Sequence, residues 1–135
     1  MAKKSILIVD PDAVLSALLE DILGEEGYRV RSIRSLDEAV ALLAEHHFDL
    51  VITEAYLQRG RLDFDPAFLP GLKAAAGDTP LVLLSTYTST STIHVGDFGL
   101  AQVVPKPFDI DDLLNKVARA LGNASPAVNG PKRRA

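Results

Sequence analysis

Four short apolar runs recur along the chain, and each leads to a polar residue of a different kind. The runs cover residues 6–9, 50–52, 81–84 and 103–104, and the polar residues are Asp10, Glu54, Ser85 and Lys106. Uninterrupted apolar runs of this length are typical of strands buried on both faces of a parallel sheet. Ligand sites of such sheets lie at the carboxyl ends of the strands, so we expect these four side chains to meet there.

Segments with helical spacing of apolar residues alternate with the strands predicted over 5–9, 49–53 and 80–85. Asp12, Ser35 and Asp109 each precede such a segment and are suited to cap a helix. Another helix is predicted over 66–76, where Pro70 lacks a backbone N–H and should shorten or break it. The apolar face of the first helix is assigned to Val14, Leu15, Leu18, Leu19, Ile22 and Leu23.

Two segments lack this regularity. Residues 28–33 alternate between polar and apolar, which predicts an edge strand with one solvent-facing side. Residues 86–98 occupy the place of a helix, yet all residues from Thr86 to Thr92 are Thr, Ser or Tyr. Such residues are poor helix formers. We therefore expect a short, irregular helix or a mobile loop that forms an adaptable surface.

Composition and charge narrow the function classes. The 135 residues correspond to one domain, predicted over 1–121, followed by a disordered basic tail over 122–135. Without the three basic residues at 132–134, 11 basic residues stand against 18 acidic ones, which makes nucleic acid an unlikely partner. No apolar run is long enough for a signal peptide or a membrane span, so we expect a cytoplasmic bacterial protein.

The four strand ends together resemble the receiver domain of two-component response regulators, over residues 4 to about 121. The resemblance implies an α/β fold of the flavodoxin-like (βα)5 type, with three layers and a five-stranded parallel sheet of order 2-1-3-4-5. A working receiver accepts a phosphoryl group on an aspartate, with Mg²⁺ held by a pair of acidic residues. A hydroxyl residue and a lysine then hold the phosphate.

Several family positions differ in this sequence. Asp10 matches the first acidic residue, but Pro11 stands in place of the second, and Asp12 lies one position further on. Glu54 matches the phosphoacceptor with one additional methylene, and a displacement of about an ångström can cost on the order of a hundredfold in rate.

The switch positions are retained only in part. Ser85 and Lys106 match the family, whereas Val103 replaces the aromatic residue that many receivers use as a switch, and Gln58 replaces a usual proline. The resemblance also implies a cis peptide bond between Lys106 and Pro107. Because Glu54 and Lys106 both follow strands, we expect them to pair, either as a partial imitation of the phosphorylated state or as a plain ion pair.

These observations predict a stand-alone atypical receiver, a signalling protein and not an enzyme, that acts through protein contacts without aspartate phosphorylation. The expected partner surface is 86–120, and the expected partners are a histidine kinase or an output protein; a homodimer stays open. Mg²⁺ should bind weakly or not at all. One alternative is a working Mg²⁺-dependent receiver that uses Glu54 or a displaced Asp12. Another is a flavodoxin-like module that binds a small molecule.

Overall fold

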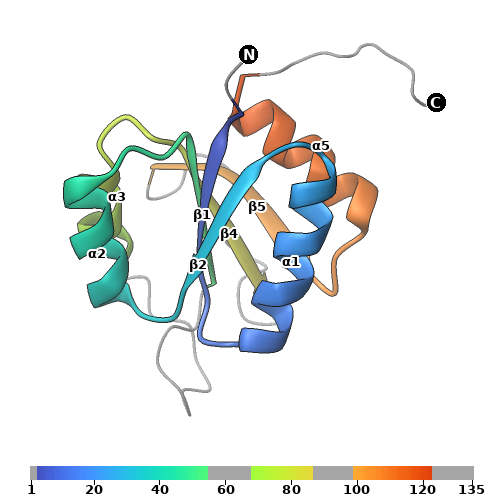
Figure 1. Ribbon diagram of the computed structural model, residues 1–135, viewed down its shortest axis with the longest axis horizontal. Coiled ribbons are helices and arrows are strands. Elements are labelled where there is room, and N and C mark those ends of the chain that lie inside the picture. The colour runs from blue at the N-terminus through green and yellow to red at the C-terminus, as the bar shows by residue number, and fades with distance from the viewer. Residues whose placement is uncertain (1–2, 55–67, 87–98, 123–135) are drawn as a thin grey trace.

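The computed structural model describes residues 3–54, 68–86 and 99–122, in which five parallel strands form one sheet between two layers of helices (Figure 1). The strands are β1 (Ser5–Val9), β2 (Arg29–Ile33), β3 (Leu50–Glu54), β4 (Leu81–Thr86) and β5 (Leu100–Lys106). The helices are α1 (Ala13–Glu25), α2 (Leu36–Glu45), α3 (Leu69–Ala76) and α5 (Ile110–Ala120). The strand order β2-β1-β3-β4-β5 confirms the predicted flavodoxin-like fold.

The central strands are apolar throughout because both of their faces are covered. α1 and α5 lie on one face of the sheet, and α2 and α3 lie on the other (Figure 1). In β1, Ile6 and Ile8 pack into the cluster under α1 and α5, while Leu7 and Val9 pack into the cluster under α2 and α3. The alternating side chains of one strand therefore contribute to two hydrophobic cores.

β2 is the edge strand that the alternating pattern predicts. It pairs only with β1 among the described strands, with Val30 opposite Ile6. Arg29 and Arg31 are exposed, whereas Val30 is half-buried against the core under α1 and α5. A strand that has one neighbouring strand and one solvent-exposed face needs apolar residues only at alternate positions.

The predicted capping residues open three of the helices. Asp12 accepts hydrogen bonds from the backbone of the first turn of α1, and Asp109 does the same for α5. The Ser35 hydroxyl accepts from the Glu38 N–H at 3.2 Å at the start of α2. In each case a side-chain oxygen satisfies N–H groups that have no partner within the helix.

α3 is short, as predicted, but Pro70 does not break it. Pro70 lies in the first turn of α3, where a backbone N–H would have no partner in the helix and its loss costs little. The expectations for residues 66–67, for most of 86–98 and for nearly all of the tail over 122–135 lie outside the described residues. None of the helices within the described residues is both long and apolar enough to cross a membrane.

Candidate functional site

The ends of three strands bring together the charged residues that the sequence pattern predicts. Asp10 follows β1, Glu54 is the last residue of β3, and Lys106 is the last residue of β5. The strand predicted over 49–53 is observed one residue later, and the Asp49 carboxylate just before it accepts a hydrogen bond from the Ser5 N–H at 2.8 Å. Ser85 lies in β4, with Pro105 as its partner in β5.

The Lys106 ammonium group lies between the two buried carboxylates. Its Nζ is 2.6 Å from Glu54 Oε2 and 3.7 Å from Asp10 Oδ2. The exposed side-chain fractions are 22% for Lys106, 7% for Glu54 and 2% for Asp10. The predicted pair of Glu54 and Lys106 is confirmed as an ion pair.

Asp10 is held in place by hydrogen bonds on its backbone and side chain. Its Oδ1 accepts from the Asp12 N–H at 2.8 Å, and its own N–H donates to the Ile33 carbonyl at 3.0 Å. Burial raises the pKa of the Asp10 carboxyl above its ordinary value of 3.8, although the Asp12 N–H and the Lys106 charge act in the opposite direction. The loss of hydration therefore outweighs the local attraction for the ionised form.

The two positions after Asp10 supply no carboxylate to the pair at Lys106. Pro11 has no carboxylate and is half-buried. Asp12 is exposed, and its Oδ1 accepts from the N–H groups of Val14 at 3.0 Å and Leu15 at 3.1 Å. The Asp12 carboxylate is thus the cap of α1. Within the described residues, no group of three or more His, Cys, Asp or Glu side chains has the arrangement of a metal site.

The remaining predicted positions lie along β5. Val103 is half-buried against the core under α2 and α3, and its carbonyl accepts from Lys116 Nζ at 2.9 Å. The peptide bond between Lys106 and Pro107 is cis, as predicted from the resemblance. Gln58 lies outside the described residues.

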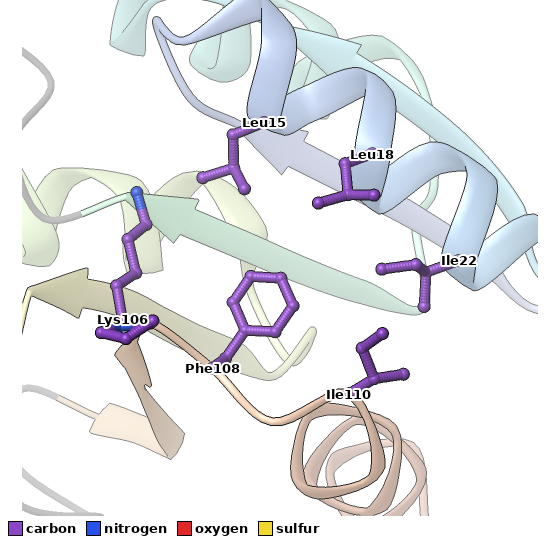
Figure 2. Close-up of a pocket in the computed structure, with 7 residues that line it drawn as sticks. Leu15, Leu18, Ile22, Lys106, Phe108 and Ile110 are labelled. Carbon is purple, nitrogen blue, oxygen red and sulfur yellow. The ribbon is translucent and has the colours of Figure 1, made fainter.

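The sequence pattern did not reveal an apolar groove next to Lys106. The groove lies between α1 and the start of α5, with Leu18 and Ile22 of α1 on one side and Phe108 and Ile110 on the other (Figure 2). Val14 and Leu18 were assigned to the buried face of α1, but Val14 is 81% exposed and Leu18 is 48% exposed. The number of apolar positions gave no signal of this exposure, because six are about what one face of a 13-residue helix carries.

The sequence matches a family model described as "Response regulator receiver domain" over residues 6–118. It is 31% identical to the DNA-binding transcriptional regulator NtrC of Rhizobium meliloti over 135 residues, covering 99% of this chain and 26% of that protein. It is 33% identical over 117 residues to the nitrogen assimilation regulatory protein NtrX of Azorhizobium caulinodans, covering 86% of this chain and 26% of that protein. The chain therefore spans about a quarter of the length of these curated relatives.

Solved structures show the same fold. NtrX from Brucella abortus has a TM-score of 0.77 at 29% identity, with 90% of this chain and 27% of that chain covered. The chemotaxis response regulator CheY4 of Vibrio cholerae has a TM-score of 0.74 at 22% identity, with 88% and 99% covered. The second likeness concerns the fold alone, and it extends over almost the whole of that protein.

Proposed function

Since the chain belongs to the response regulator receiver family of two-component signalling, we propose that it is an atypical receiver that signals by protein contact without aspartate phosphorylation. One observation carries this proposal. The Lys106 ammonium group already pairs with Glu54 at 2.6 Å and lies 3.7 Å from Asp10. The charge that would hold a phosphoryl group in a working receiver is thus bound to the chain's own acids.

The side chains of this site do not suit Mg²⁺. Magnesium requires near-octahedral oxygen ligation, which proteins supply through one or two carboxylates and several waters. Pro11 contributes no ligand, and the Asp12 carboxylate caps α1. The Lys106 ammonium group beside Asp10 and Glu54 would also repel a divalent cation. We therefore expect weak Mg²⁺ binding or none.

Glu54 itself can supply a permanent negative charge in place of a phosphoryl group. Its carboxylate extends one methylene further than the aspartate of a working receiver, and it is buried and paired with Lys106. In this proposal the pair holds the receiver in one state, partly imitating the phosphorylated form. Partner binding at the surface 86–120 would then be constitutive, with a histidine kinase or an output protein as the partner.

The expectation that nucleic acid is not a partner rests on the excess of acidic residues alone. The similar NtrC protein of Rhizobium meliloti is named as a DNA-binding regulator, so the likeness does not strengthen that expectation.

The alternative function is a working Mg²⁺-dependent phosphoacceptor that uses Glu54 or a displaced Asp12. An Asp12 carboxylate that moved to the site would give up its hydrogen bonds to the N–H groups of Val14 and Leu15. Loss of such a helix cap costs about 1 kcal/mol. This cost makes the displaced Asp12 the less favourable arrangement.

Calorimetric titration with Mg²⁺ tests the proposal. The wild-type protein should show no saturable heat up to millimolar Mg²⁺, and the Asp10→Asn variant should give the same trace. A millimolar or tighter site in the wild type that disappears in Asp10→Asn would contradict the proposal and favour the phosphoacceptor.

A further inference from the structure

The outer edge of β2 leaves backbone groups without a strand partner. The Arg29 N–H donates to the Lys4 carbonyl at 2.8 Å, and the Ile33 carbonyl accepts from the Asp10 N–H at 3.0 Å, so Arg29 and Ile33 face β1. In a parallel ladder, alternate residues of a strand bond to the same neighbouring strand. The N–H and carbonyl groups of Val30 and Ser32 therefore point to the open edge, where the described residues supply no strand.

Three arginines lie along this edge. Arg29 and Arg31 belong to β2 and Arg34 follows it, and all three are exposed. None of them forms an ion pair with another described residue, although the chain as a whole has a net charge of −4. Charged side chains on an edge strand prevent pairing with a like edge. The same charges attract a strand of the opposite sign.

The two faces of β2 differ in character. Arg31 is in register with Leu7, which packs under α2 and α3, so Arg29 and Arg31 lie on that side of the sheet. Val30 lies on the other side, half-buried against the core under α1 and α5. Figure 1 shows β2 with α2 on one side and α1 on the other. The side chains of a strand added to β2 alternate in the same way, one set beside the arginines and the other beside Val30.

Charge and backbone chemistry narrow the choice of occupant. Antiparallel pairing of two copies through β2 would place the arginines of one copy beside those of the other, which is destabilising. The end of the chain is basic as well, with Lys132, Arg133 and Arg134. Nucleic acid and anionic lipids carry negative charge, but they have no row of N–H and carbonyl groups to pair with Val30 and Ser32.

We propose that the open edge of β2 binds an extended acidic segment of a partner protein, which adds a strand to the sheet. Acidic side chains at alternate positions of the segment pair with Arg29 and Arg31, and the apolar side chains between them lie beside Val30. In this mode of recognition, backbone hydrogen bonds supply affinity and the alternating side chains supply specificity. β2 has five residues, or about 16 Å, so a segment of about five to seven residues is long enough.

This edge is separate from the site at the strand ends. β2 and β5 lie at opposite ends of the strand order, so the proposed segment does not reach the surface 86–120. Binding at β2 also requires no change in the pair of Glu54 and Lys106. The proposal therefore does not depend on whether the receiver accepts a phosphoryl group.

Two synthetic peptides of alternating sequence test the proposal, one of glutamate and valine and the other of lysine and valine. Fluorescence anisotropy should show that the full chain binds the glutamate peptide at least about tenfold more tightly, with a difference that falls as salt rises. Arg31→Gln should weaken this binding by about three- to fivefold. Arg119→Gln is the matched control, because Arg119 is exposed and has no ion pair with a described residue but lies in α5. It should leave binding unchanged.

Two N-methylated forms of the glutamate peptide distinguish strand addition from attraction between charges alone. Methylation removes the backbone N–H of a residue, and it can be placed on either of the two sets of alternate residues. Methylation of one set should weaken binding at least about tenfold, and methylation of the other should have little effect, because only alternate residues of a strand face its neighbour.

Hydrogen exchange in the wild-type protein gives a readout that needs no variant. The glutamate peptide should protect the Val30 and Ser32 amides, while Arg29 and Arg31, which already face β1, should change little. The proposal is overturned if neither peptide binds, if both methylated forms bind equally well, or if a single-stranded oligonucleotide protects the same two amides. Protection of these amides in a dimer of the free chain would identify a second copy as the occupant and would also overturn it.

Discussion

Replacement of Lys106 by methionine measures how much its charge stabilises the site. The change keeps most of the aliphatic stem and removes the ammonium group, which leaves two carboxylates, of Asp10 and Glu54, that are 2% and 7% exposed. Removal of one partner of a buried ion pair costs about 3–5 kcal/mol. Lys106 is 22% exposed, so water can enter and reduce the cost, and we expect about 2–3 kcal/mol at neutral pH.

Lys116→Met is the matched control for this experiment. Lys116 is 25% exposed, pairs with the more exposed Asp112 at 3.1 Å, and donates to the Val103 carbonyl at 2.9 Å. Both variants lose one positive charge, so long-range electrostatic effects are similar. The control should lose only about 1 kcal/mol, because partly exposed pairs and single hydrogen bonds contribute little.

Urea denaturation followed by circular dichroism gives the free energy of unfolding of both variants. For a domain of this size, the Lys106→Met loss corresponds to a fall in melting temperature of about 6–12 °C. The loss should shrink as the pH falls toward 4, because protonation removes the charge of the orphaned carboxylates. Equal losses of unfolding free energy in Lys106→Met and Lys116→Met, or a loss that does not vary with pH, would refute the conclusion that the Lys106 charge stabilises two buried carboxylates.

Three further outcomes are expected. Because the pKa of Asp10 is raised, the folded protein keeps the proton on this carboxyl at pH values where the unfolded chain has lost it. The contribution of Asp10 to the free energy of unfolding therefore falls as the pH rises above 3.8. Asp10→Asn should therefore weaken the pH dependence of the free energy of unfolding above pH 3.8. An unchanged pH dependence would contradict a raised pKa of Asp10 in the folded protein. Asp12→Ala should cost about 1 kcal/mol by urea denaturation, while Asp12→Asn, which can still cap α1, should cost much less. If both variants are equally stable, the cap is not the role of Asp12. Residues 88–96 should exchange their amide hydrogens faster than β1; protection equal to that of β1 would contradict the hypothesis of an adaptable surface.

The fold could be predicted from the sequence because local and long-range signals agree. Apolar runs set the strands, and the capping residues Asp12, Ser35 and Asp109 set the starts of three helices. The strand order came from the family resemblance, since periodicity alone does not say which strands are neighbours. The short α3 was expected, but the place of Pro70 in its first turn was not, because helix boundaries are hard to place from sequence.

The site was predictable in part. The contact between Glu54 and Lys106 followed from their places at two strand ends. The approach of the same lysine to Asp10 followed from the same reasoning, but the raised pKa of that carboxyl depends on burial that no sequence spacing encodes. The exposure of Val14 and Leu18 was missed for a similar reason. Helical periodicity gives the direction of an apolar face, but neighbouring elements decide how much of that face is covered.

Intact mass after incubation with a small phosphodonor and Mg²⁺ tests the central claim most directly. The wild-type protein should keep its mass. The double variant Pro11→Asp with Glu54→Asp restores an aspartate at both altered positions. It should gain the mass of one phosphoryl group under the same conditions, which shows that the assay can detect a working site. Phosphorylation of the wild type that is lost in Glu54→Gln would contradict the claim that this receiver acts without phosphoryl transfer.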